Sequence, residues 1–234
     1  MRALRRRTAR LFAFDRALDA RTVAGADEAG RGCLAGPLVC AAVCLDLAAL
    51  RGRPRRLLHD LDDSKRLDAR ARARLAEVLL AHAPQVVVRV ASPATIDRDG
   101  LHVTNLRLLG EALAALDPFP EVALVDGFRL GPAAPAHRAV PGGDRRSAAI
   151  AAASIIAKTT RDRLMAGPVA AAHPEYGFER NVGYATADHR EAIVRVGPST
   201  MHRRSFRSPS YPWVADGVGE RLDRQGGGPS SLAP

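Results

Sequence analysis

The stretch that most constrains this chain is VAGADEAGRG, residues 23–32, where an apolar run ends in two adjacent carboxylates and a glycine-flanked arginine. Adjacent strand residues point to opposite faces, so Asp27 and Glu28 can share one ion only if the pleat breaks, which the following glycines permit. Clustered carboxylates raise each other's pKa unless a positive charge separates them, and hard divalent cations such as Mg²⁺ or Mn²⁺ usually supply it. A polar strand exit with a surface salt bridge is an equally good interpretation of these ten residues.

The chain has 234 residues, 47% of them hydrophobic, and a formal net charge of +10. This length allows one large domain or a domain with tails. The basic excess favours an anionic partner, with nucleic acid the leading candidate. Nearly all the basic residues are arginine, so part of the excess reflects compositional habit.

Three cysteines, Cys33, Cys40 and Cys44, fall in one apolar stretch without a Cys-x-x-Cys pair. Reduced, buried thiols in a cytoplasmic protein are expected, and a zinc site is disfavoured. No apolar run is long enough for a membrane helix, and no apolar segment follows the basic N-terminus as in a signal peptide. We therefore expect no membrane association.

Alternating strand and helix patterns predict an α/β domain with one central sheet. The expected strands are 23–26, 34–45, 85–91, 121–125 and 136–140, and the main expected helices are 67–82, 102–116, 147–165 and 186–196. Residues 1–21 are arginine-rich and weakly patterned, which indicates a flexible or loosely docked basic arm. Residues 208–234 are rich in proline, glycine and serine, which indicates a flexible tail.

Three predicted strand ends carry acids, namely Asp27-Glu28, Asp126 and Asp144. Strand ends and the loops beyond them are where α/β sheets bind ligands. Four carboxylates converging there would form a two-metal site for in-line displacement at a phosphodiester. Taken singly, Asp126 before a glycine is more typical of a turn, and Asp144 is equally typical of a helix N-cap.

Nine short motifs occur in one order along residues 22–207. They are DEAGRG (27–32), DSKRL (63–67), VDG (125–127), GD (143–144), IAAASIIAK (150–158), TRDR (160–163), HPEYGF (173–178), GY (183–184) and HRRSF (202–206). Together they resemble bacterial ribonuclease HII. The resemblance implies a ribonuclease H-like fold, a five-stranded mixed sheet flanked by helices, with a C-terminal helical segment.

The resemblance also implies an activity. It predicts a monomeric, Mg²⁺- or Mn²⁺-dependent endonuclease that hydrolyses RNA in RNA–DNA hybrids and nicks at single ribonucleotides in duplex DNA. Cleavage would leave 5′-phosphate and 3′-hydroxyl ends. The related ribonuclease HIII carries an extra N-terminal domain, for which 1–21 is too short.

The implied roles fall on matching residues. Asp27, Glu28, Asp126 and Asp144 match the family's metal-binding acids, and Gly30-Arg31-Gly32 matches a loop that reads the 2′-hydroxyl at an RNA–DNA junction. A 2′-hydroxyl is what distinguishes RNA from DNA at one site.

The other implied substrate contacts come from separate motifs. Tyr184 matches a tyrosine that stacks on the deoxyribose after the ribonucleotide, the alternative being a half-buried loop tyrosine. Lys65 and Lys158 are the only lysines, and each suits a contact with a phosphate or a carboxylate network. Lys158 could also lie in its helix and simply support Asp144 or the sheet. Ser64 and Ser147 suit phosphate binding or simple capping.

Some residues are left with weaker assignments. Arg161, Asp162 and Arg163 more plausibly form a structural ion-pair set than a metal site, and three histidines, His173, His189 and His202, lack zinc spacing. Two rival functions stay open, a nuclease of this fold acting on DNA junctions and a non-catalytic hybrid-binding protein. The four intact acids argue against the second rival, because a pure binder gains nothing from negative charge beside phosphates.

Overall fold

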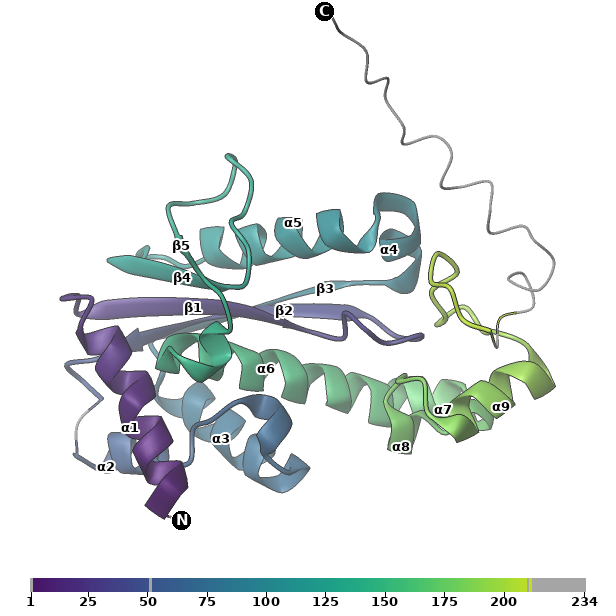
Figure 1. The fold of residues 1–234 in the computed structure, drawn as a ribbon, viewed down its shortest axis with the longest axis horizontal. Coiled ribbons are helices and arrows are strands. Elements are labelled where there is room, and N and C mark those ends of the chain that lie inside the picture. The colour runs from purple at the N-terminus through teal and green to yellow at the C-terminus, as the bar shows by residue number, and fades with distance from the viewer. Residues whose placement is uncertain (1, 51, 210, 212–234) are drawn as a thin grey trace, which may run out of the picture.

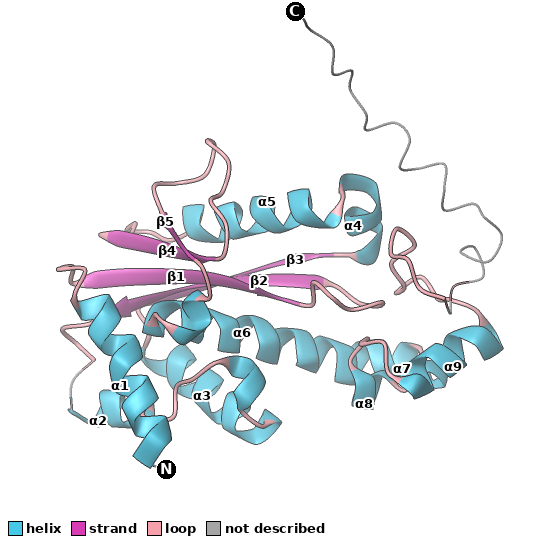
Figure 2. Ribbon diagram, viewed as in Figure 1, coloured by secondary structure: helices cyan, strands magenta, loops and turns pink. Residues whose placement is uncertain are grey.

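A five-stranded sheet in the order β3-β2-β1-β4-β5 lies at the centre of the molecule, with helices on both faces (Figures 1 and 2). The computed structural model describes residues 2–50, 52–209 and 211. The strands are β1 (Thr22–Ala29), β2 (Leu38–Asp46), β3 (Gln85–Ala91), β4 (Val122–Asp126) and β5 (Arg138–Val140). Strand β1 pairs antiparallel with β2 and parallel with β4, so the predicted mixed sheet is confirmed.

Two helical layers cover the sheet. Helix α5 packs on one face, and α6 packs on the other with α1 and α3 outside it (Figure 1). The larger helices are α1 (Arg2–Arg16), α3 (Ala69–His82), α5 (Leu101–Ala114), α6 (Ala148–Leu164) and α9 (Ala187–Val196). The shorter ones are α2 (Gly52–Leu57), α4 (Pro93–Asp99), α7 (Ala170–Ala172) and α8 (Phe178–Asn181).

The two central strands are buried on both sides, which explains their continuous apolar sequence. Val23 and Leu45 face the α6 layer, whereas Ala24 and Leu38 face the α5 layer. A third cluster, built around Met165, Tyr176 and other side chains, lies toward the C-terminal end under α7, α8 and α9. The C-terminal segments that border the candidate site pack on this third cluster.

Helix α6 approaches strand β1 unusually closely at Gly25. A Cβ atom at this position would lie 2.2 Å from the Ala149 carbonyl carbon and 2.2 Å from the Ile150 nitrogen. Only a residue without a side chain allows backbone contact at this distance. The alanine-rich first half of α6, fully buried from Ala148 to Ala153, completes the tight layer.

The N-terminal segment differs from the expected flexible arm, because most of it is helix α1. Leu11 and Phe12 are buried in the α6-side core. The Thr8 hydroxyl donates to the carbonyl oxygens of His59 and Leu61, and Asp15 accepts from the Ala149 N–H at 2.9 Å. The prediction of a loose arm was wrong. The partners that dock this helix lie 51 to 134 residues away in the sequence, so the local pattern gives no sign of them.

The first described residues of the expected C-terminal tail are packed against the domain, which differs from the prediction. Ser208 is buried, and the Tyr211 hydroxyl donates to the Leu34 carbonyl oxygen at 2.8 Å from a fully buried ring. The remainder of the predicted tail, residue 210 and residues 212–234, lies outside the described residues. Cys33, Cys40 and Cys44 are free and buried, as expected. Within the described residues, no helix has the length and apolar character needed to cross a membrane.

Replacing Gly25 by alanine tests the α6–β1 contact. Gly25→Ala forces α6 away from the sheet, and the free energy of unfolding falls by about 2 kcal/mol or more. Gly131→Ala is the matched control, because a Cβ there meets nothing within 4 Å. Urea unfolding of both variants measures the difference, and equal stabilities would contradict the close approach.

Candidate active site

Three of the four predicted acids lie at one edge of the sheet. Asp27 and Glu28 are near the end of β1, and Asp126 ends β4. The parallel register pairs Ala26 with Val125, so Asp27 and Asp126 are the next positions on neighbouring strands. Neighbouring strands are about 4.8 Å apart, which places these carboxylates in electrostatic contact.

The fourth acid, Asp144, is held near Asp126 by a hydrogen bond that its neighbour Gly143 donates. Asp144 lies in a 3-10 turn, Gly143–Arg145, and the Gly143 N–H donates to Asp126 Oδ1 at 2.6 Å. Asp144 is 4% exposed, and Arg145 Nε lies 3.7 Å from one of its carboxylate oxygens. The same Nε lies 3.7 Å from Asp63, a buried acid that the sequence analysis left without a role.

Burial makes the negative charge of this cluster costly. The pKa of Asp27 is raised well above its usual value, first by burial and then by the charges of Glu28 and Asp126. The Glu28 pKa is also raised by burial, while Arg31, 3.3 Å from its carboxylate, acts in the opposite direction. The cluster therefore favours either protonation or an added cation.

The donor chemistry fits a hard divalent cation, because the ligands are carboxylate oxygens. The carboxylates are not yet arranged around one point. In the described part of the chain, no three or more His, Cys, Asp or Glu side chains are placed to hold a metal ion. Asp27, Glu28 and Asp126 must turn toward a common point to ligate one. The metal-binding role of these acids and of Asp144 stays a prediction.

A pocket of about 440 Å³ opens beside Glu28. It brings together six of the predicted substrate contacts, Gly30, Arg31, Gly32, Ser64, Lys158 and Tyr184, with Glu28, Ala29 and Ser154 completing the lining. Ser154 connects the pocket to the acids, because its hydroxyl hydrogen-bonds Asp27 and lies 2.9 Å from the Ser64 hydroxyl. Asp27, Glu28 and six of the predicted substrate contacts thus lie together.

Two predicted substrate contacts are not in this lining. Ser147 is fully buried and caps α6, where its hydroxyl accepts from the Ile150 N–H at 3.2 Å. This position favours the capping interpretation over phosphate binding. The Lys65 backbone is in a 3-10 turn with Ser64, but its side chain lies outside the described part of the structure.

Two fully buried arginines support the glycine loop, Gly30-Arg31-Gly32, and the residues that follow it. Arg161 donates to the carbonyl oxygens of Ala35 and Pro37, both at 2.9 Å, and to that of Val182 at 2.8 Å. Arg203 donates to the carbonyls of Gly36, Pro37 and Arg31.

The close fit of Arg161 explains one glycine of the loop. Gly30 has φ of +95°, and a Cβ there would lie 2.1 Å from Arg161 Nε. Sequence reasoning missed these supports because their partners are backbone groups far along the chain.

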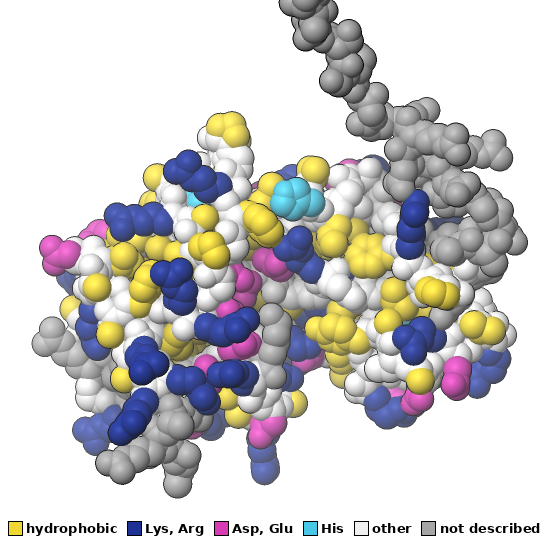
Figure 3. Space-filling model, viewed as in Figure 1, with side chains coloured by type: hydrophobic (Ala, Val, Ile, Leu, Met, Phe, Trp, Pro, Cys, Tyr) yellow, Lys and Arg dark blue, Asp and Glu magenta, His cyan; other side chains and the backbone are white. Residues whose placement is uncertain are grey.

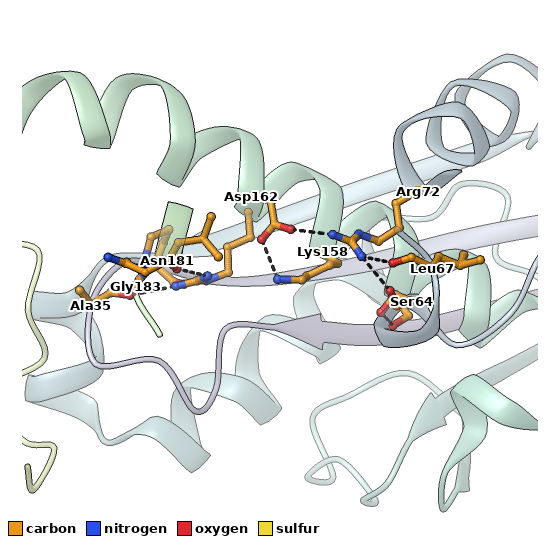
Figure 4. A network of polar contacts seen from close by, with 12 residues as sticks. Ala35, Ser64, Leu67, Arg72, Lys158, Asp162, Asn181 and Gly183 are labelled. Atoms are coloured by element: carbon orange, nitrogen blue, oxygen red, sulfur yellow. Dashed lines mark hydrogen bonds and ion pairs between the residues drawn. The ribbon is translucent and has the colours of Figure 1, made fainter. Parts of the chain in front are cut away.

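The residue after Arg161 organises the opposite wall of the pocket. Asp162 accepts from Lys158 at 2.7 Å and from Arg72 at 3.3 Å, and Arg72 also donates to the Ser64 carbonyl oxygen (Figure 4). Lys158 Nζ in turn lies 5.0 Å from the centre of the Tyr184 ring. Asp162 thus forms ion pairs, as expected, but its partners are Lys158 and Arg72. The expected set with Arg161 was wrong, because Arg161 donates to backbone carbonyl oxygens instead.

Positive charge surrounds the acidic centre. Figure 3 shows acidic side chains gathered near the middle of one face, with lysine and arginine side chains on either side. A polyanion is attracted by such a rim, whereas bare carboxylates at its centre repel it.

A sequence model of the family described as Ribonuclease HII matches residues 24–208. The chain belongs to the ribonuclease HII family. A Ribonuclease HII from Parvibaculum lavamentivorans is 47% identical over 91% of this chain and 76% of its own length. Another from Rhodospirillum rubrum is 52% identical over 79% of this chain and 83% of its own length. Membership confirms the resemblance noted from the motifs.

Solved structures agree with this assignment. The ribonuclease H2 from Pyrococcus horikoshii superposes with a TM-score of 0.66 at 26% identity, over 86% of this chain and 98% of that one. A Bst-RNase HIII in complex with Mn²⁺ superposes with a TM-score of 0.64, over 86% of this chain and 71% of that one. It shares only 22% identity and supports the fold alone. Ribonuclease HII membership makes this protein a ribonuclease H, an endonuclease acting on the RNA of RNA–DNA hybrids.

Neutralising Asp162 tests the pocket wall. Asp162→Asn removes the anchor of Lys158 and Arg72, so the KM for a hybrid substrate rises while kcat changes little, and stability falls by about 1 kcal/mol. Glu111→Gln is the control, since it removes an exposed ion pair with Arg107 on the opposite face of the sheet. Steady-state kinetics distinguish the two, and an unchanged KM in Asp162→Asn would contradict this role.

Proposed function

We propose that this ribonuclease HII cleaves hybrid RNA and also nicks duplex DNA at single embedded ribonucleotides by two-metal-ion hydrolysis. The observation that carries the proposal is the meeting of Asp27, Glu28 and Asp126 at the edge of β1 and β4, beside the pocket of the glycine loop. Asp27, Glu28, Asp126 and Asp144 would hold the ions, Mg²⁺ or Mn²⁺. Bound divalent ions supply an activated water and stabilise the leaving 3′-oxygen, giving 5′-phosphate and 3′-hydroxyl ends.

The other residues of the pocket bind and orient the duplex. The backbone of Gly30, Arg31 and Gly32 approaches the 2′-hydroxyl of the ribonucleotide, because two of these positions carry no side chain. The buried arginines fix that loop before substrate arrives, which lowers the cost of ordering it on binding. Lys158, held by Asp162, presents an ammonium group to a backbone phosphate.

Tyr184 provides the contact that recognises the junction. Its ring is 40% exposed at the pocket and lies near Lys158 and Arg161. An exposed ring close to two cations is available to stack on the deoxyribose after the ribonucleotide. We propose that the protein acts as a monomer on hybrids and on duplex DNA containing ribonucleotides.

Substitution of the acids tests the metal assignment. Asp27→Asn and Asp126→Asn each lower kcat on a hybrid by roughly a hundred- to a thousandfold, because charge stabilisation at the phosphate is lost, while hybrid binding persists. Asp188→Asn, an exposed carboxylate on α9, is the control. EDTA abolishes cleavage, and added Mg²⁺ or Mn²⁺ restores it. Cleavage at the parent rate by either active-site variant would contradict the assignment.

Truncation of Tyr184 tests junction recognition. Tyr184→Ala lowers cleavage of a duplex with one ribonucleotide roughly tenfold more than cleavage of a long hybrid, because only the former depends on a single stacked junction. Tyr184→Phe, which keeps the ring, retains the parent ratio. An all-DNA duplex is the control against the rival function of a DNA-junction nuclease. The parent enzyme cuts the duplex with one ribonucleotide and leaves the all-DNA duplex uncut. Equal losses on both ribonucleotide-containing substrates would remove the proposed role of Tyr184.

A further inference from the structure

A hydrogen-bonded pair of buried histidines connects the C-terminal segment to Tyr184. His189 and His202 are 0% and 2% exposed, and their Nε2 atoms are 3.1 Å apart. His189 Nδ1 lies 2.8 Å from the Tyr184 carbonyl oxygen, and His202 Nδ1 lies 2.9 Å from the Ser199 backbone nitrogen. The four contacting groups form one continuous chain.

The two ends of this chain fix where every proton is. A carbonyl oxygen only accepts, so His189 Nδ1 carries a hydrogen and donates to Tyr184. A backbone N–H only donates, so His202 Nδ1 is bare and accepts from Ser199. His202 Nε2 then carries its hydrogen and donates to the bare Nε2 of His189. Both rings are neutral, and each has one defined tautomer.

We propose that His189 is a positioning residue for cleavage, and that the neutral His202–His189 pair holds the Tyr184 backbone so that its ring faces the pocket. The inference rests on the proposed junction role of Tyr184. The Tyr184 carbonyl also accepts from the Thr186 N–H at 2.8 Å, and both its lone pairs are then used. The Tyr184 N–H donates to the Asn181 carbonyl oxygen, so both sides of this peptide segment are restrained.

The other end of the histidine pair is attached to residues 34–35, which directly follow the Gly30-Arg31-Gly32 loop. His202 forms an antiparallel bridge with Ala35, and the Arg203 N–H donates to the Leu34 carbonyl oxygen at 2.9 Å. The Ala35 N–H also donates to the Gly183 carbonyl oxygen at 3.2 Å. The histidines thus hold the tyrosine segment against the residues that follow the Gly30-Arg31-Gly32 loop, and a stacking contact on the next sugar requires this fixed relation.

An added proton on either ring breaks the chain. On His189 it would place two N–H groups face to face between the Nε2 atoms, and on His202 it would occupy Nδ1 and face the Ser199 N–H. Burial opposes this, and it lowers the pKa of His202 to about 4 and that of His189 below its usual value. The titratable side chains facing the pair are Tyr176, Tyr211 and His173, and none of them is a carboxylate. Burial and the lack of a facing carboxylate therefore both favour the neutral pair.

Histidine ¹⁵N–¹H spectra of the intact parent protein test the proton assignment directly. At neutral pH the expected spectrum shows His189 protonated at Nδ1 only and His202 at Nε2 only. The opposite tautomer in either ring, or a doubly protonated ring, would overturn the proposal. This readout involves no substrate, so it stands apart from any failure of the proposed function.

Two substitutions at one position test the positioning role. His189→Leu removes the donor to Tyr184, so cleavage at a single ribonucleotide falls roughly three- to tenfold while cleavage of a long hybrid changes little. His189→Asn carries an amide donor near the place of Nδ1 and restores most of the loss. His82→Ala, an exposed histidine at the end of α3, is the control and leaves both substrates unaffected.

The backbone amide shifts of residues 183–186 separate the two proposals. They move in His189→Leu and stay near the parent values in His189→Asn if the histidine positions this segment. If these shifts follow the prediction but Tyr184→Ala shows no junction preference, the junction role fails and the histidine chain stands. Equal shifts and equal losses in both His189 variants would overturn the positioning role.

Discussion

The close packing of helix α6 on strand β1 is the contact on which the candidate site depends. Gly25 lets the two backbones meet, and Asp15 anchors the start of the helix through the Ala149 N–H. Residues four and three apart share one face of a helix, so Ser154, Lys158 and Arg161 follow one another along one side of α6, and the first two line the pocket. One helix therefore supports Asp27, a cationic wall and the glycine loop at fixed positions.

Charge gives this arrangement its chemical character. Asp27, Glu28 and Asp126 are brought together by parallel strands, and the burial of Asp27 and Glu28 raises the pKa values of these two. Around them, Arg161 and Arg203 are buried against carbonyl oxygens and stabilise loops instead of neutralising the acids. The acids thus keep a negative potential that a divalent cation can satisfy, beside a basic surface suited to a polyanion.

Much of the fold follows from local sequence patterns. The β-branched run of 85–91 is β3, and the expected helix 186–196 is α9 almost to the residue. The four acids were singled out because each follows an expected strand, whereas the pocket residues were assigned from the resemblance to ribonuclease HII, since Lys158 lies within α6 and has no local signature.

What the sequence did not reveal depends on distant partners. Leu11 and Phe12 in an arginine-rich segment look like a loose arm until their core contacts are formed, and Arg161 reads as a surface charge until carbonyls over 100 residues away surround it. The pairing of His189 with His202 has no signature in spacing, because it joins a helix to a loop in space.

The central claim is that carboxylates from β1 and β4 close around divalent cations. Anomalous diffraction from crystals soaked in Mn²⁺ measures this most directly. The account predicts strong anomalous peaks within about 2.0–2.5 Å of carboxylate oxygens of Asp27, Glu28 and Asp126. Full occupancy by Mn²⁺ elsewhere, with no peak at these three side chains, would contradict it.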